Sequence, residues 1–271
     1  MEFEPFDIGR FLIAPDRKLH CLLIKTELMS GVLEKLASIA AKYGVKVLYI
    51  SYSMPRDYEK LVRALVFIDV TDATAPVEQL LEEARKLKFV REIRDMKPEI
   101  EGFALDLFSF PLVIEGKRVI ILREQGIKGI INGLRKRLGS AAEAIQYFLG
   151  FEAGLEFGEN HRRIGERLGI KKHSEIFSRI SAPMFVTVGF GVMKVLKISD
   201  NPPYAHIRIY GCFECECAPK KSEKPYSHLV RGMIAGVFTR LFGVEMTVKE
   251  IKCVAMGDPY CEFEAYPRKQ V

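Results

Sequence analysis

The amino-acid sequence predicts an α/β (α+β) protein with two domains, a ferredoxin-like βαββαβ domain over residues 1–100 and a second domain over residues 101–271. Three observations support this prediction. The length of 271 residues suits two compact domains better than one. Strand and helix patterns follow the order β-α-β-β-α-β within the first hundred residues. Five of the six cysteines lie in the last sixty residues, so the two halves differ in character.

The first half contains four strand patterns and two helix patterns. We expect the first helix to begin with Ser30 as its N-cap and to stop at Gly44, in the left-handed conformation that glycine tolerates. The second helix opens within residues 71–76 and presents a regular apolar face. Short apolar or alternating runs predict the strands at 19–25, 45–52, 61–70 and 89–94.

The second half begins with a predicted hairpin, in which strands within 103–114 and 118–122 flank Glu115-Gly116-Lys117. Helical periodicity starts near residue 127 and predicts one long helix over 140–168. The elements expected after it are strands at 190–198 and 206–217, a helix at 229–242, and two strands joined by a turn at Gly257-Asp258-Pro259.

Glycines recur every four residues in both predicted helices of the second half, at positions 150, 154 and 158 and at positions 232 and 236. This spacing keeps them on one helix face, although each glycine costs about 1 kcal/mol relative to alanine in a helix interior. A stripe of this kind indicates that another group approaches the helix backbone closely. Packing between helices of one subunit is the favoured interpretation, and a dimer interface or a ligand-binding wall is the alternative.

The composition excludes several classes of protein. No apolar run is long enough for a transmembrane helix, and the acidic start lacks the basic residues of a signal peptide, so we expect a cytoplasmic protein without a membrane partner. The net charge of +6 is only mildly basic, and we interpret the basic runs at 135–137 and 171–172 as solvated surface rather than as direct nucleic-acid contacts.

Cysteines of a cytoplasmic protein stay mostly reduced, which favours metal binding over disulfides. On the predicted strand 206–217, Cys215 and Cys217 would face away from Cys212, so these three thiols would not hold one ion together. Near the turn at 257–259, Cys253 and Cys261 would face each other, and with Glu250 they make three zinc-compatible ligands. A β-bulge is needed there, because a regular strand points residues 250 and 253 to opposite faces.

Several motifs together resemble the 4-vinyl reductase domain family over about residues 103–267. They are Gly232-Met-Ile-Ala-Gly236, Phe242-Gly243, Glu250-x-x-Cys253, Gly257-Asp-Pro-x-Cys261-x-Phe263 and Leu149-Gly-Phe-Glu-Ala-Gly154-Leu-Glu-Phe-Gly158. The resemblance implies a fold similar to the haem nitric-oxide-binding and Golgi-transport ligand-binding domains, a largely apolar ligand pocket, and a homodimer. Members of the family serve as sensor domains in activators that respond to aromatic compounds.

Metal-bearing members of this family hold zinc with a cysteine before the glycine-striped helix, followed by a Glu, a Cys and a Cys. The last three fall on Glu250, Cys253 and Cys261, whereas Ser227 stands where the first is expected. The zinc site is therefore either vacant or completed by a neighbouring side chain, namely His228, Cys215 or Cys217. Three thiolates are chemically reasonable, and so are two thiolates with one imidazole and one carboxylate.

The first half resembles an ACT domain over residues 18–97, through its length, its element order and its Ser30-Gly31 entry into the first helix. ACT domains commonly bind amino acids near this turn, so Ser30 and Gly31 are the candidate contacts for an amino-acid effector. A small residue there would let a ligand approach the backbone. The simpler interpretation is that Gly31 only permits a tight turn between strand and helix.

For the apolar or aromatic ligand that the resemblance implies, the candidate contacts are aromatic and histidine side chains, although aromatic residues at helical spacing more often belong to a core. The sequence contains no GxGxxG, GxxxxGK[ST] or HExxH motif, and a reductase needs a source of hydride or electrons. A ligand-binding regulator is therefore favoured over the alternative, a reductase that acts on vinyl or aromatic groups of a tetrapyrrole-like substrate. The candidates are Phe148, Phe151 and Phe177, with His161, His173 or His206 as polar contacts.

Overall fold

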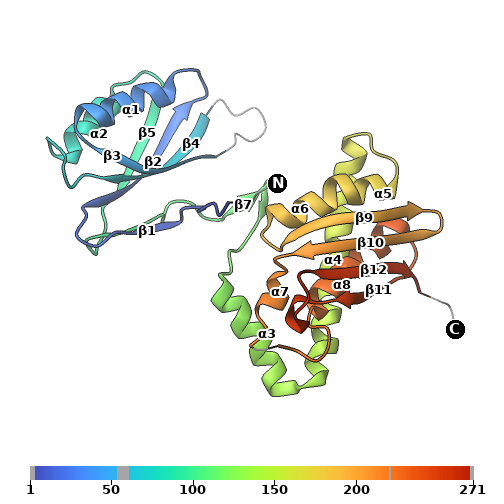
Figure 1. The fold of residues 1–271 in the computed structure, drawn as a ribbon. Coiled ribbons are helices and arrows are strands. Elements are labelled where there is room, and N and C mark those ends of the chain that lie inside the picture. The colour runs from blue at the N-terminus through green and yellow to red at the C-terminus, as the bar shows by residue number, and fades with distance from the viewer. Residues whose placement is uncertain (1–3, 54–60, 220, 269–271) are drawn as a thin grey trace. The chain divides into compact units, whose positions relative to one another are not determined.

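A computed structural model describes residues 4–53, 61–219 and 221–268 of the chain. The chain divides into two compact units, residues 1–120 and residues 121–271, each with its own apolar core (Figure 1). This division falls twenty residues after the expected boundary at 100/101. The reason is a strand pair: β6 (Phe103–Leu105) pairs antiparallel with β1 (Phe11–Ile13), which ties residues beyond 100 to the first unit.

The first unit has the expected ferredoxin-like order of elements. Its antiparallel sheet runs β3-β4-β2-β5, and α1 and α2 pack on one face through the main apolar core of this unit. The bounds are β2 (Leu19–Glu27), α1 (Val32–Lys42), β3 (Lys46–Ser53), β4 (Leu61–Asp69), α2 (Val77–Arg85) and β5 (Val90–Met96). The four strands and two helices expected here are confirmed.

The start of α1 differs from the expectation. Gly31, not Ser30, occupies the N-cap position, and no side chain caps the helix. Gly31 has a φ of 83°, a left-handed conformation that most residues avoid, and a Cβ at this position would meet nothing within 4 Å. The strand therefore turns into the helix through the glycine backbone. Gly44, with a φ of 67°, ends the helix region in the left-handed conformation as expected.

The hairpin after β6 is shorter than the expected strands. Its paired residues are those of β7 (Val113–Ile114) and β8 (Lys117–Arg118). Glu115 and Gly116 form the two-residue turn between them, both with positive φ.

The second unit contains an antiparallel sheet of order β11-β12-β10-β9 with helices against it (Figure 1). The sheet strands are β9 (Val192–Asp200), β10 (Pro203–Tyr210), β11 (Met246–Lys252) and β12 (Cys261–Pro267). The helical segments are α3 (Glu124–Leu138), α4 (Ser140–Arg167), α5 (His173–Ile176), the π-helix η1 (Phe177–Ser181), α6 (Ala182–Thr187), α7 (Phe213–Glu216), α8 (His228–Phe242) and the 3₁₀ turn η2 (Val254–Met256).

The two glycine stripes pack against each other inside this unit, as the favoured interpretation held. A Cβ on Gly154 would lie 2.2 Å from the carbonyl oxygen of Met233 in α8. In the other direction, a Cβ on Gly236 would lie 2.1 Å from the carbonyl oxygen of Phe151 in α4. Only glycine lets the two backbones approach this closely, so the stripes hold α4 against α8.

No helix in the described part of the chain is long and apolar enough to cross a membrane.

Candidate metal centre

Four buried side chains of the second unit converge on one point: Cys215, Glu250, Cys253 and Cys261. Their ligand atoms all lie within 4.8 Å of one another. The Sγ atom of Cys215 is 3.5 Å from that of Cys253 and 3.4 Å from that of Cys261. The same sulfur is 4.0 Å from Oε1 of Glu250. We refer to these four residues as the Cys3Glu cluster.

The β11–β12 hairpin supplies three members of the cluster. The register of β11 against β12 shifts between Glu250 and Lys252, which is the β-bulge that the sequence required. The bulge lets Glu250 and Cys253 point to the same side of the hairpin. Gly257 then turns the chain with a φ of 102°, and Cys261 begins β12 beside Cys253.

The fourth member comes from a segment whose secondary structure was predicted wrongly. The strand expected over 206–217 ends at Tyr210, and Gly211 turns the chain with a φ of 58°. The short helix α7 follows, so the alternation expected for Cys212, Cys215 and Cys217 does not apply. Cys215 points into the cluster, whereas the thiol of Cys217 donates a hydrogen bond to the carbonyl of Phe213 at 3.2 Å and stays outside it.

Backbone N–H groups surround the cluster and favour its charged form. The N–H of Tyr226 donates to Sγ of Cys253 at 3.4 Å, and the N–H of Val254 donates to Sγ of Cys261 at 3.4 Å. The N–H of Ser227 donates to Oε2 of Glu250 at 3.3 Å. Hydrogen bonds of this kind orient metal ligands and stabilise thiolates and carboxylates.

The donor set suits a zinc ion. Three thiolates and one carboxylate are ligands that zinc accepts in four-coordinate sites, and soft sulfur ligands disfavour magnesium and calcium. Burial raises the pKa of the Glu250 carboxyl to about 7, because a carboxylate in this apolar setting lacks a cation. A bound cation would reverse that preference. The Cys3Glu cluster can therefore hold a metal ion.

Two residues considered as ligands from the sequence lie outside the cluster. Nε2 of His228 lies 3.7 Å from Glu143, and burial, reinforced by the Arg135 cation, lowers the pKa of the imidazole to about 4. Ser227 is buried, and its Oγ has no hydrogen-bond partner among the described residues. Cys215 thus occupies the role for which His228 was one candidate.

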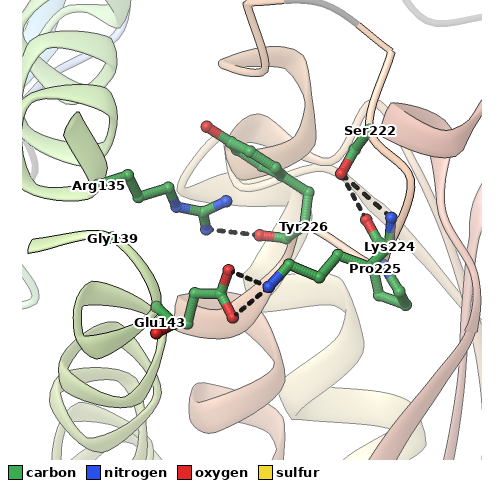
Figure 2. Close-up of a pocket in the computed structure, with 8 residues that line it drawn as sticks. Arg135, Gly139, Glu143, Ser222, Lys224, Pro225 and Tyr226 are labelled. Carbon is green, nitrogen blue, oxygen red and sulfur yellow. Dashed lines mark hydrogen bonds and ion pairs between the residues drawn. The ribbon is translucent and has the colours of Figure 1, made fainter.

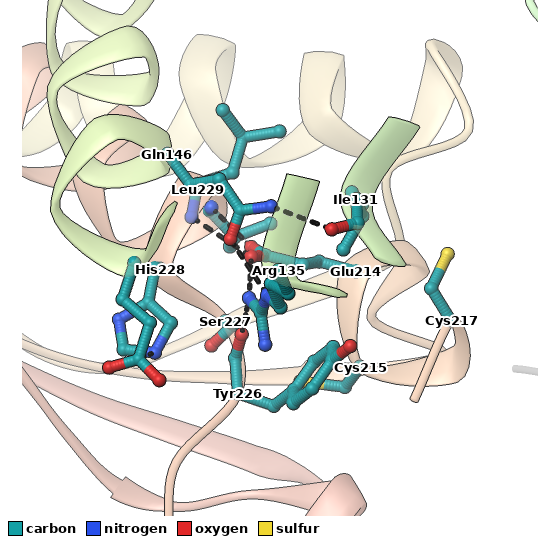
Figure 3. Close-up of polar contacts among 12 residues, drawn as sticks. Ile131, Arg135, Gln146, Glu214, Cys215, Cys217, Tyr226, Ser227, His228 and Leu229 are labelled. Atoms are coloured by element: carbon teal, nitrogen blue, oxygen red, sulfur yellow. Dashed lines mark hydrogen bonds and ion pairs between the residues drawn. The ribbon is translucent and has the colours of Figure 1, made fainter. Parts of the chain in front are cut away.

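A buried ion-pair network holds α7 and α8 next to the cluster (Figure 3). The Glu214 carboxylate accepts hydrogen bonds from the N–H groups of Leu229 at 3.1 Å and Val230 at 2.8 Å, at the start of α8. Arg135 of α3 donates to the same carboxylate at 2.9 Å and to the carbonyl of Tyr226 at 2.6 Å. Sequence reasoning missed Glu214, because nothing in the local pattern indicates a buried carboxylate beside Cys215.

A cavity of about 300 Å³ opens next to this network (Figure 2). Its charged lining residues are Arg135, Glu143 and Lys224, and Lys224 forms an ion pair with Glu143 at 2.7 Å. The Arg135 guanidinium also lies over the ring of Tyr226, 3.5 Å from its centre. This lining is polar, unlike the largely apolar ligand pocket expected from the sequence.

The structure does not bring the four predicted ligand contacts together. Phe148 is 63% exposed on α4, while Phe151 is half-buried against the core. Phe177 is fully buried in η1 and stacks on Phe238 of α8, with 4.2 Å between ring centres. His206 lies on β10, where Nε2 is 2.7 Å from Oε1 of Glu262. In the first unit, the effector candidates Ser30 and Gly31 are both exposed at the turn before α1.

Comparisons with known proteins agree with this fold. The family model of the 4-vinyl reductase domain matches residues 205–267, which include the whole Cys3Glu cluster. An uncharacterized protein of Methanocaldococcus jannaschii, MJ0150, is 26% identical over 125 residues, which is 46% of this chain and 65% of the relative. The chain thus matches somewhat less than two thirds of that relative's length.

Solved structures extend the likeness beyond the matched residues. The phenol-responsive sensory domain of the transcription activator PoxR superposes on 56% of this chain and 77% of its own, with a TM-score of 0.51 and 18% identity. It has the same fold as the second unit. The ACT domain from GTP pyrophosphokinase of Chlorobium tepidum aligns with 30% of this chain and 99% of its own, at a TM-score of 0.24 and 13% identity.

Proposed function

The C-terminal unit carries a 4-vinyl reductase domain, and from that premise we propose that the protein is a small-molecule-binding regulatory or sensor protein with a structural zinc site. One observation carries the proposal: the residues that match this domain family lie in a unit with the fold of a phenol-responsive sensory domain. We expect the ligand to be apolar or aromatic. No nucleic acid is expected to bind directly, so the output would pass through a partner protein.

We assign the zinc ligands to Cys215, Glu250, Cys253 and Cys261. Zinc bound there would link α7 to the β11–β12 hairpin and supply structural stability. The three thiols and the carboxylate are already close together, and the N–H groups of Tyr226, Ser227 and Val254 hold three of them in place. This support by the backbone favours a permanent structural site over a transient one.

The proposal extends to the first unit and to the quaternary structure. We propose that an amino-acid effector binds near Ser30 and Gly31, where the open space beside Gly31 leaves room for a ligand to approach the backbone. We also propose a homodimer, supported by the exposed apolar side chains of Ile145, Phe148 and Leu149 on α4. Light scattering should then give twice the chain mass of 30.8 kDa.

Native mass spectrometry of the full chain, purified without chelators, tests the function. The expected spectrum contains one zinc ion per chain and a further adduct when phenol or another small aromatic compound is added. Zinc without any adduct, across a panel of aromatic and apolar compounds, would contradict the sensor function. A retained flavin or nicotinamide would instead favour the reductase alternative, because either supplies reducing electrons.

A further inference from the structure

Two polar side chains of the second unit are buried without a partner, far along the chain from the Cys3Glu cluster. His161 on α4 is 7% exposed and Ser181 at the end of η1 is 6% exposed. Among the described residues, neither Nδ1 of His161 nor Oγ of Ser181 has a hydrogen-bond partner. Buried polar atoms are paired in the great majority of cases, because an unpaired one costs about 1–3 kcal/mol. Each therefore calls for a specific explanation.

The packing of α4 against α5 and η1 places the two side chains at the same level. A Cβ on Gly165 would lie 2.8 Å from Cγ1 of Ile176, which fixes where the helices cross. The connection between them is short, so the chain reverses and the pair continues with α4 in contact with η1. One turn back along α4 from Gly165 is His161, and one turn forward from Ile176 lie Ile180 and Ser181.

Aromatic rings lie beside this level of the helices. Phe177 of η1 stacks on Phe238 of α8, and Phe238 lies 5.8 Å from Phe242, measured between ring centres. Ile176, Ile180 and Leu241 belong to the same buried cluster. The surroundings of the two polar atoms are therefore apolar and rich in aromatic surface, which favours a flat apolar ligand with few polar groups.

The backbone and the charge state support a binding role. The five residues Phe177–Ser181 form a π-helix, a rare conformation that is frequent at functional sites. Burial also lowers the pKa of His161 to about 4, so the imidazole is neutral near pH 7. A neutral imidazole and a hydroxyl can each accept or donate a hydrogen bond, so together they suit a single hydroxyl group better than a charged group.

We propose that His161 and Ser181 are the polar anchors for a small aromatic ligand with one hydroxyl group, bound between α4, η1 and α8. The inference rests on the proposed sensor function and deepens it, since it names the ligand class and the residues that select it. It moves the polar contact from His206, whose ring already pairs with Glu262, to His161. Phe177 keeps its role as an aromatic contact.

Isothermal titration calorimetry on the full chain tests the anchors, with phenol as the hydroxylated probe and toluene as its apolar counterpart. Ser181→Ala should weaken phenol binding about tenfold and leave toluene binding within about twofold, because the variant removes one hydrogen bond and no apolar contact. His161→Phe should do the same. Thr26→Val is the matched control: Thr26 is also buried with an unpartnered hydroxyl among the described residues, but it lies in the first unit, so phenol binding should not change.

A second measurement covers the case in which His161→Phe does not fold. In the unaltered protein, the side-chain ¹⁵N resonances of His161 should shift on addition of phenol and not on addition of toluene. If the protein binds phenol but Ser181→Ala binds it equally well and the His161 resonances stay in place, the anchors are refuted and the sensor function stands. If the protein binds neither probe nor any other aromatic compound, the anchors and the sensor function fail together.

Discussion

Two buried cysteines two residues apart play opposite roles, and this difference is testable at the scale of single residues. Cys215 lies 3.4 Å and 3.5 Å from the other two thiols of the Cys3Glu cluster, whereas Cys217 bonds to the carbonyl of Phe213 within α7. Cys215→Ser should lower zinc affinity by more than about 100-fold, because loss of a direct ligand exceeds the 10–100-fold cost of losing a supporting contact. Chelator competition measures the affinity.

Cys217→Ser is the control for this prediction. It makes the same chemical change in a side chain that is equally buried, and a serine hydroxyl can replace the thiol in the bond to Phe213. Its zinc affinity should match that of the unaltered protein. Equal losses in the two variants would show that burial in α7, rather than ligation, explains the effect.

His161 also predicts how stability depends on pH. Its pKa is lowered from 6.5 to about 4 by burial, so the unfolded chain binds a proton more readily than the folded one between these values. The stability contribution of the neutral ring is complete above pH 6.5 and is lost as the pH falls toward 4, by at most about 3 kcal/mol. Urea denaturation should show that His161→Phe removes this loss. A variant that loses as much stability as the unaltered protein over this range would contradict the assignment.

At the scale of elements, the contact between α4 and α8 depends on glycine. Gly154→Ala would place a Cβ 2.2 Å from the backbone oxygen of Met233, which cannot move without displacing α8. The change should lower the free energy of unfolding by about 2 kcal/mol or more, because overpacking outweighs the gain of about 1 kcal/mol in helix propensity. Thermal or urea denaturation measures the difference.

The matched change in an uncrowded helix should have the opposite sign. Gly129 lies in the interior of α3, is exposed, and has nothing within 4 Å of a Cβ position. Gly129→Ala should therefore stabilise the protein by up to about 1 kcal/mol. If both substitutions proved equally stabilising, close packing would not be the reason for the glycine stripe.

The elements also show how far sequence reasoning reaches. Periodicity predicted the long helix α4 and the strands of the first unit, because a whole face of each contacts a core. Spacing predicted the bulge at Glu250, since three zinc-compatible residues required it. The four-residue helix α7 was missed, because the alternating pattern of 206–217 continues past Tyr210 and only the turn at Gly211 ends the strand. Cys215 was consequently oriented wrongly, and His228 remained a candidate ligand.

At the scale of the whole molecule, the protein consists of two units with separate apolar cores. The core of the first unit packs α1 and α2 on the β3-β4-β2-β5 sheet, and that of the second unit lies among α8, η1 and the β11-β12-β10-β9 sheet. All four members of the Cys3Glu cluster belong to the second unit. Any stabilisation by metal should therefore act on one core and leave the other unchanged.

Differential scanning calorimetry of the full chain should accordingly resolve two unfolding transitions. Removing zinc with a chelator should lower the midpoint of one transition, because a ligand bound only to the folded state contributes about 4 kcal/mol when its concentration is a thousand times its Kd. Cys215→Ser should lower the same transition without chelator and make it insensitive to chelator. The other transition, from the first unit, should stay in place in all three experiments. A single transition that moves as a whole would instead mean that the two units unfold cooperatively, and the metal would then stabilise the entire chain.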